Sequence, residues 1–318
     1  MRSVFLSNGS IKQLDIPKPV ASKAETLVKV TMAGICNTDL ELVKGYMGFE
    51  GVPGHEFVGV VAEAQDSNLV GRRVCGEINF GCGDCDECLK GLQRHCPSRT
   101  VLGILNQNGA FADFVTIPET NLRFVPDSVT DRQAVFVEPV AAAMEILEQV
   151  HVEPNQQVAV VGDGKLGLLI CQVLKLTGCE LCLIGKHARK LEMAENWGVR
   201  ALHKDLAGQQ QFDLVVEASG SPSGFETALA LLRPRGTLVL KSTYAGNLEF
   251  DAAPIVINEI TLVGSRCGPF KPAIRTLSEN RIDTEALIDG VFPFSEALPA
   301  FERAAQPGTL KIVLDLNV

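Results

Sequence analysis

Four cysteines within fifteen residues give the chain its most specific short chemical signal. Cys82, Cys85, Cys88 and Cys96 are separated by three, three and eight positions. Two interleaved Cys-x-x-Cys pairs in a short loop can surround a tetrahedral Zn²⁺ and fill all four positions with protein ligands. The loop is too polar to hold its shape by apolar burial, so metal binding would supply the folding energy. The alternative is free thiols or two disulfides, which a reducing compartment disfavours. A closed site of this kind is structural, because it has no open position for a substrate.

Three other segments carry metal-ligand chemistry at dispersed positions. They contain Cys36 in GICNTD, the pair His55 and Glu56 in GHEFVG, and Glu138 before a proline. Each is weak alone, because a single cysteine often packs as a small hydrophobe and a single histidine is often only hydrogen-bonded in place. None of the three segments on its own establishes a second metal centre.

A glycine-rich segment follows a run of β-branched residues and precedes a helical pattern, which is the context that a dinucleotide-binding turn requires. In GDGKLG, Gly162 allows a tight turn, Gly164 lets the backbone approach a pyrophosphate, and Gly167 permits close helix packing. Lys165 and Leu166 belong to the same turn, whose amides and helix dipole would hold the phosphates. The alternative is an ordinary glycine-rich turn.

Cofactor choice depends on the end of the second strand of this half. NAD-binding enzymes carry an acidic residue there, which binds the ribose hydroxyl. Here that position is Gly185, followed by Lys186, His187 and Arg189, any of which could pair with a 2′-phosphate. We therefore predict NADP(H) in preference to NAD(H). The alternative is that Arg189 is simply a solvated residue of the next helix.

The elements that must position these residues fall into two domains. Up to about residue 140, short β runs alternate with Gly and Pro, at 26–32, 57–61, 112–117 and 122–125. Beyond it, strands at 158–161, 181–184, 214–218 and 237–240 alternate with helices at 166–176, 189–197 and 225–232. That alternation predicts parallel βαβ units. A last helix at 296–304 and a strand at 311–316 are expected to return to the first domain.

Composition excludes several other classes of protein. The chain has 318 residues, 46% hydrophobic and 21% charged, as an ordinary globular protein of two domains has. A net charge of −9 argues against nucleic acid as a partner. The most apolar stretch, 158–184, is interrupted by charges, so we expect no membrane span and a cytoplasmic protein.

These motifs, in this order, resemble the zinc-dependent medium-chain dehydrogenase/reductase (alcohol dehydrogenase) superfamily from end to end. The similarity is closest to the polyol and threonine dehydrogenase branch, which keeps Glu-Pro where other members have cysteine. It implies an α/β fold: a GroES-like, mostly-β catalytic domain over 1–140, completed by 283–318, and a Rossmann doubly wound parallel-sheet domain over 141–282. It also implies a homodimer or homotetramer joined near 248–263.

The resemblance assigns roles to the dispersed residues. Cys36, His55 and Glu138 would bind a catalytic zinc, Glu56 would lie beside it, and either glutamate could be the resting ligand. Asp39 would orient the His55 imidazole. Three protein ligands leave one position open for a substrate oxygen, unlike the four-cysteine site.

Other roles carried by the resemblance are less direct. Thr38 matches the hydroxyl of a proton relay, in which Glu41 occupies the place of a histidine and could equally be a surface charge. Ser219 and Arg266 lie in segments that approach the cofactor in the family.

The expected activity is hydride transfer between an alcohol or carbonyl substrate and a nicotinamide cofactor, with two zinc ions per subunit. The loops after Glu41 and Cys96 are short for the family, so the substrate stays open; Tyr46, Phe49 and Phe111 could line its pocket or belong to the core. Two rival functions are a zinc-free quinone or enoyl reductase of the same superfamily and a non-catalytic nucleotide-binding redox sensor or structural protein.

Overall fold

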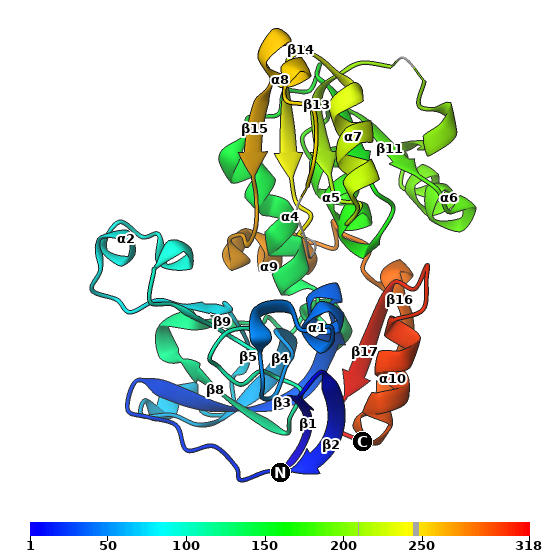
Figure 1. The fold of residues 1–318 in the computed structure, drawn as a ribbon. Coiled ribbons are helices and arrows are strands. Elements are labelled where there is room, and N and C mark those ends of the chain that lie inside the picture. Colours follow the sequence, from blue (N-terminus) through cyan, green and yellow to red (C-terminus); the bar gives the residue numbers. More distant parts are fainter. Residues whose placement is uncertain (209, 244–247) are drawn as a thin grey trace. The chain divides into compact units, whose positions relative to one another are not determined.

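The computed structural model describes residues 1–208, 210–243 and 248–318 and divides into two units (Figure 1). Unit 1 comprises Met1–Glu138 and Phe270–Val318, and unit 2 comprises Pro139–Pro269. The chain returns to unit 1 at Phe270, earlier than the expected residue 283. The reason is helix α9 (Phe270–Ser278), which buries Phe270, Ala273 and Leu277 and packs against α3 (Asp131–Ala134).

A six-stranded parallel sheet forms the centre of unit 2. Its strand order is β12-β11-β10-β13-β14-β15, so the first strand in sequence lies beside the second and the fourth. This is the 3-2-1-4-5-6 order of dinucleotide-binding folds, in which ligands bind at the carboxyl ends of the strands. The strands are β10 (Gln157–Val161), β11 (Glu180–Gly185), β12 (Arg200–His203), β13 (Phe212–Glu217), β14 (Leu232–Leu240) and β15 (Thr261–Gly264).

The crossover helices of unit 2 pack on neighbouring strands of its sheet. Helix α5 packs on β10 and β11, α6 on β11 and β12, and α7 on β13 and β14. Most of α5 is buried, and besides the sheet it contacts helix α6. The bounds are α4 (Val137–Gln149), which starts in unit 1, α5 (Lys165–Lys175), α6 (Ala188–Asn196), α7 (Pro222–Ala230) and α8 (Ala253–Ile257).

Unit 1 is built on a seven-stranded sheet around the long strand β3 (Glu25–Ile35). Antiparallel β4 and β17 pair with β3, and β8 pairs with its first half. Parallel β16 joins β17, while β5 and β9 extend the sheet beyond β4. The remaining bounds are β4 (Glu56–Glu63), β5 (Arg73–Gly76), β8 (Phe114–Pro118), β9 (Leu122–Phe124), β16 (Ile288–Pro293) and β17 (Lys311–Asp315).

Smaller elements complete unit 1. A hairpin of β1 (Arg2–Ser7) and β2 (Ser10–Asp15) and the pair β6 (Asn79–Phe80) and β7 (Thr100–Val101) form two-stranded sheets. The helices are α1 (Asn37–Val43), α2 (Asp86–Leu89) and α10 (Ala297–Ala304), besides α3 and α9. Within the described residues, no helix combines the length and apolar character needed to cross a bilayer.

Candidate functional site

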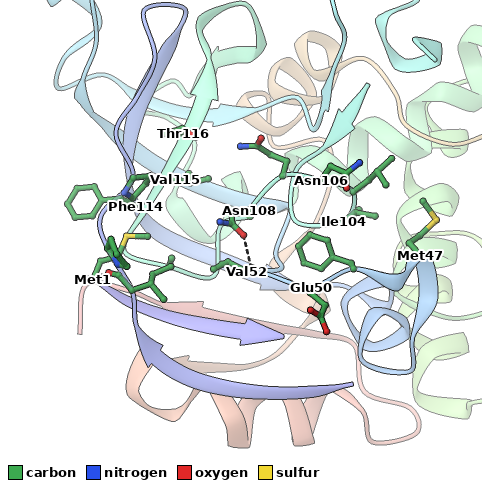
Figure 2. A pocket seen from close by; sticks show the side chains of 18 of the residues that line it. Met1, Met47, Glu50, Val52, Ile104, Asn106, Asn108, Phe114, Val115 and Thr116 are labelled. Carbon is green, nitrogen blue, oxygen red and sulfur yellow. Dashed lines mark hydrogen bonds between the residues drawn. The ribbon is translucent and has the colours of Figure 1, made fainter. Parts of the chain in front are cut away.

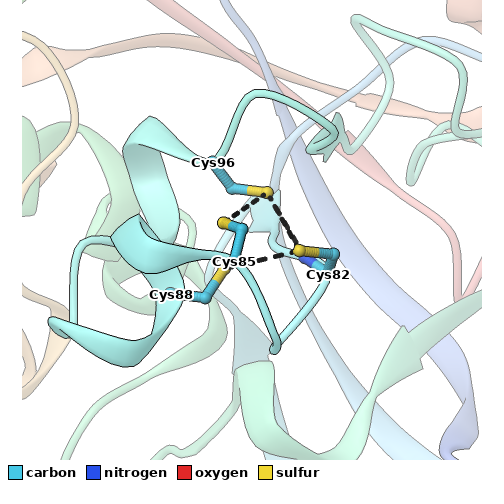
Figure 3. Close-up of side chains that lie close together, drawn as sticks. All are labelled: Cys82, Cys85, Cys88 and Cys96. Carbon is cyan, nitrogen blue, oxygen red and sulfur yellow. Dashed lines mark hydrogen bonds between the residues drawn. The ribbon is translucent and has the colours of Figure 1, made fainter.

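The four cysteines of the 82–96 loop converge in space (Figure 3). Cys96 Sγ lies 3.6 Å from Cys82 Sγ and 3.7 Å from Cys85 Sγ, and Cys82 Sγ lies 4.0 Å from Cys88 Sγ. A tetrahedron with zinc–sulfur bonds of about 2.3 Å has sulfur atoms about 3.8 Å apart. All four cysteines are free thiols. The donor set therefore fits a zinc ion and not the disulfide alternative.

The loop itself prepares these thiols for a cation. Helix α2 places Cys88 three residues after its N-cap, Cys85, and the Cys82 amide donates a hydrogen bond to Cys96 Sγ at 3.4 Å. This backbone donor, helped by neighbouring thiols, lowers the pKa of Cys96 to about 7. Because thiolates rather than thiols bind metal, a lowered pKa favours the form that binds.

A second group of donor atoms lies where β3 meets β4 in unit 1. Ligand atoms of Cys36, His55 and Glu56 lie within 4.8 Å of one another. Gly34 pairs with Glu56 across the antiparallel ladder, so Cys36, just beyond the end of β3, comes to lie beside the start of β4. Only glycine fits at position 34, because a Cβ there would lie 2.7 Å from Glu56 Oε2.

Asp39 organises this group from helix α1. Its Oδ2 accepts a hydrogen bond from the Cys36 amide at 2.8 Å, and its Oδ1 accepts one from the Gly54 amide at 3.2 Å. Oδ1 also lies 3.4 Å from Nδ1 of His55, although that buried nitrogen makes no hydrogen bond. The contact occupies the Nδ1 side of the ring, which leaves the other ring nitrogen for a metal.

The electrostatics of the group favour a positive charge. Burial opposes protonation of His55, but Asp39 and Cys36 outweigh it and raise the pKa of the imidazole well above its usual value. A pocket that stabilises an imidazolium supplies the negative potential that Zn²⁺ needs, together with sulfur, nitrogen and oxygen donors. The residues present fit a zinc ion.

Lys311 is a member of this neighbourhood that sequence reasoning missed. Its ammonium forms a salt bridge with Glu56, and both side chains are 1% exposed. Strand β17 carries it there, because Ile312 pairs with Ile35 of β3. Burial lowers the pKa of Lys311, but Glu56 and Cys36 reverse that effect and raise it. A lysine in a buried strand is the only sequence signal that could have indicated it.

The other predicted residues of this region have different surroundings. Glu138 lies in the first turn of helix α4 and is not a member of the 4.8 Å group. Thr38 accepts a hydrogen bond from Cys36 Sγ at 3.8 Å. Glu41 pairs with Lys44 at 2.7 Å on an exposed face of α1, as the surface-charge alternative expects. Phe111 is fully buried and stacks edge-on with Phe301 at 5.5 Å, so it belongs to the core.

A separate cavity of about 380 Å³ lies elsewhere in unit 1 (Figure 2). Phe49 lines it together with Met47, Glu50 and the 104–109 loop. Among the described residues that line it, none belongs to the Cys36–His55–Glu56 group. Of the three aromatic residues considered for a substrate pocket, Phe49 alone lines this one.

The glycine-rich turn of unit 2 has the geometry of a phosphate-binding loop. Gly162 has a φ of +119°, and a Cβ at Gly167 would lie 1.9 Å from the Gly162 carbonyl oxygen. Gly164 is the N-cap of α5, without a side-chain capping bond, and a Cβ there would meet nothing within 4 Å. Lys165 and Leu166 open the helix. Open space before an uncapped helix N-terminus fits a pyrophosphate.

The remaining predicted residues of unit 2 lie just beyond the carboxyl ends of strands of its sheet. Lys186 and Arg189 are exposed, whereas His187 contacts Asp163 of the glycine-rich loop. Ser219 donates a hydrogen bond to Glu217 at 2.6 Å, and the Arg266 carbonyl accepts one from the buried Lys241 at 2.8 Å. Asp163 and Lys241 were missed, because their partners are set by the tertiary fold.

Comparison with known proteins agrees with this geometry. Residues 22–127 match the alcohol dehydrogenase GroES-like domain family, and residues 166–280 match the zinc-binding dehydrogenase family. The chain is 30% identical to D-arabinitol dehydrogenase 1 of Uromyces fabae, over 97% of this chain and 94% of that protein. The chain belongs to the zinc-binding alcohol dehydrogenase family.

Two solved structures of the same fold carry different cofactors. The alcohol dehydrogenase rspB from Escherichia coli CFT073, complexed with NADH, matches with a TM-score of 0.92 and 27% identity, over 99% of both chains. A zinc-binding dehydrogenase from Sinorhizobium meliloti 1021, bound to NADP, matches with a TM-score of 0.90 and 26% identity, over 99% of this chain and 98% of that one. The fold class expected from the sequence, a GroES-like domain with a Rossmann domain, is confirmed.

Proposed function

We propose that this protein is a zinc-dependent dehydrogenase that oxidises a hydroxyl of a polyol with a nicotinamide cofactor, and reduces the carbonyl product in reverse. The observation that carries the proposal is the convergence of Cys36, His55 and Glu56 within 4.8 Å. Similarity to a D-arabinitol dehydrogenase over nearly the whole chain supports the substrate class.

The chain's own residues have distinct tasks in this proposal. Cys36 and His55 would hold the zinc, and Glu56 or Glu138 would complete its protein ligands. When bound, the zinc lowers the pKa of a hydroxyl toward neutral and polarises a carbonyl. Asp39 orients the His55 ring through its contact with Nδ1, and Thr38 carries the substrate proton away.

We propose NADP(H) as the preferred cofactor. Residue 185 is a glycine, and a side chain at this position would collide with Asp163. The exposed Lys186 and Arg189 follow it. Cations at this strand end favour a 2′-phosphate. Because related folds hold either NADH or NADP, the proposal depends on these residues rather than on the fold.

Two zinc ions per subunit and a homo-oligomer complete the proposal. The closed four-cysteine site and the site at Cys36 would each take one ion. Strand β15 is at the edge of its sheet, with Leu262 exposed, and Val256 and Ile257 of the preceding helix are also exposed. An apolar sheet edge of this kind supports pairing with a second copy.

A panel of arabinitol, xylitol and sorbitol, with 2-propanol as the monohydric control, tests the activity with NADP and NAD. We expect reduction of NADP with at least one polyol and a higher kcat/KM than with NAD. Elemental analysis should give two zinc ions per subunit. One zinc ion and no turnover on any alcohol would instead favour a non-catalytic nucleotide-binding protein.

A further inference from the structure

The Asp163 carboxylate bridges two loops at the carboxyl end of the sheet of unit 2. It belongs to the glycine-rich turn after β10 and reaches the segment after β11. Its Oδ2 accepts hydrogen bonds from the amides of Lys186 at 2.8 Å and His187 at 2.7 Å. His187 Nδ1 lies 2.9 Å from Oδ1. Asp163 is 5% exposed, so this carboxylate is turned into the protein.

Gly185 and Asp163 are spatially linked. A Cβ at Gly185 would lie 2.6 Å from Asp163 Cβ and from Oδ2. The strand end therefore has no room for the acidic residue that binds the ribose in NAD enzymes. A carboxylate is nevertheless present at this edge, supplied by the preceding loop. Both oxygens of the Asp163 carboxylate are already engaged by Lys186 and His187. The ribose of a bound cofactor would therefore meet the exposed side chains at this edge instead.

The contact with Asp163 fixes the orientation of the His187 ring. An ionised carboxylate only accepts hydrogen bonds, so the Nδ1 that it contacts carries the hydrogen. Burial opposes ionisation of Asp163, but hydrogen bonds from His187 and Lys186 outweigh it and keep its pKa below the usual value. The imidazole side chain is 36% exposed, and Nε2 is its remaining polar atom. Such an imidazole, when protonated, donates from Nε2 to an anion.

The surroundings of the ring are cationic. Lys186 and Arg189 are exposed on the same segment. On the adjacent strand, Gly185 pairs with His203, and the exposed Lys204 follows it. Asp205 is the exposed acid of that strand end, and it contacts His203 and Lys204. With Asp163 buried, the outward-facing charge at this edge is positive, which suits a phosphate dianion.

We propose that Asp163 is a positioning residue for cofactor selection, which holds His187 so that Nε2 contacts the 2′ substituent of the adenosine ribose and favours a 2′-phosphate. This inference rests on the proposed use of a nicotinamide dinucleotide and adds the pair of residues that discriminates between its two forms. The mechanism is indirect for Asp163 and direct for His187.

Two nucleotides isolate this contact from the rest of the cofactor. Adenosine 2′,5′-bisphosphate carries the 2′-phosphate, and adenosine 5′-monophosphate lacks it. Titration calorimetry on the full-length, zinc-replete protein gives the ratio of their dissociation constants. We expect Asp163→Asn and His187→Ala each to weaken bisphosphate binding about tenfold, the effect of losing one charge-assisted hydrogen bond, and monophosphate binding less than about twofold.

Three controls separate positioning from a general charge or folding effect. The double variant should resemble each single variant, because both changes remove the same contact. Asp205→Asn removes a neighbouring negative charge without touching His187 and should leave the ratio within about twofold. Far-UV circular dichroism and thermal melting identify variants that fail to fold; Asn at 163 keeps an oxygen for the two amides.

The pH profile supplies a readout that a purely structural role would not change. In the wild type, the preference for the bisphosphate should depend more strongly on pH than in His187→Ala, because only a protonated imidazole donates from Nε2 to an anion. His187→Ala gives the baseline for titration of the phosphate itself, whose second pKa is about 6.

Each outcome is decisive. If the Asp163→Asn and His187→Ala ratios equal that of the wild type, or if Asp163→Asn binds the bisphosphate more tightly, the positioning role is wrong. If the wild type prefers the monophosphate, the proposed NADP preference fails. In that case the positioning role is still tested by the two variants: it is supported if Asp163→Asn and His187→Ala change the ratio of the two dissociation constants by similar amounts, and it is wrong if they do not.

Discussion

Lys311 and Glu56, 255 residues apart in sequence, form a buried salt bridge beside the candidate metal donors. Lys311 also lies 5.7 Å from the centre of the Phe136 ring. Glu56 is therefore held by a counter-charge on one side and borders Cys36 and His55 on the other. The arrangement of the site therefore depends on β17, which carries Lys311.

Replacing Lys311 by Met should destabilise the protein by about 3–5 kcal/mol, because the buried Glu56 charge would lose its partner. Lys18→Met is the matched control: Lys18 pairs with Glu63 at 2.8 Å on the surface, and its loss should cost less than about 1 kcal/mol. Urea denaturation measures both. If both variants lose the same unfolding free energy, the buried pair contributes no more to stability than the surface pair, and the prediction is wrong.

The two cysteine sites should respond differently to substitution. Cys36→Ser should remove one zinc and reduce kcat more than about 100-fold while the fold survives. Cys85→Ser should remove the other zinc and lower the Tm by roughly 5 °C or more, since metal binding stabilises the loop. Cys179→Ser, outside both groups, should keep two zinc ions. Identical behaviour of the first two variants would refute the division into catalytic and structural sites.

Two glycines of the same turn should separate stability from cofactor binding. Gly167→Ala places a Cβ 1.9 Å from a carbonyl oxygen and should cost about 1–3 kcal/mol in unfolding free energy. Gly164→Ala meets no atom within 4 Å, so it should cost less than about 1 kcal/mol. It should still weaken NADPH binding, because its methyl group would occupy the phosphate space. Thermal melting and calorimetry measure the two effects; unchanged affinity in Gly164→Ala would place the cofactor elsewhere.

Acid should reveal the stability that Asp163 contributes. Its pKa is lowered from the usual 3.8 in the folded state, so its contribution is full above that value and is lost as pH falls through the lower folded pKa. The difference in unfolding free energy between wild type and Asp163→Asn should therefore narrow below about pH 4. Chemical denaturation at several pH values measures it, and a difference independent of pH would exclude an ionised Asp163.

Local signals predicted the elements that carry local chemistry. The run of β-branched residues, the glycine turn and the following helix correspond to β10 and α5, with bounds that differ by a residue or two. The four-cysteine group also follows from spacing alone, since a short loop brings its members together. In these cases the partners are close in sequence, so composition and period determine the contact.

Contacts between distant segments that lie outside the recognised motifs could not be predicted from the sequence. Lys311 reaches Glu56 only because β17 pairs with β3, and register across a sheet is not encoded in either strand alone. Asp163 left a trace that was overlooked: an acid inside the glycine motif and a glycine in place of the usual acid at 185. The Asp163 side chain lies where a side chain at position 185 would be, so the unusual acid and the unusual glycine accommodate each other. Neither motif alone reveals this contact.

The place of β17 between β16 and β3 also has a consequence for biosynthesis. At about 5–20 residues per second, Glu56 leaves the ribosome roughly 13–50 s before Lys311, which follows 255 residues later. During that interval residues 32–35 of β3 lack the neighbour that β17 provides. Pro139–Pro269 is continuous and can acquire its structure meanwhile. Strand β17 therefore brings Lys311 to the buried Glu56 only after Pro139–Pro269 has been synthesised.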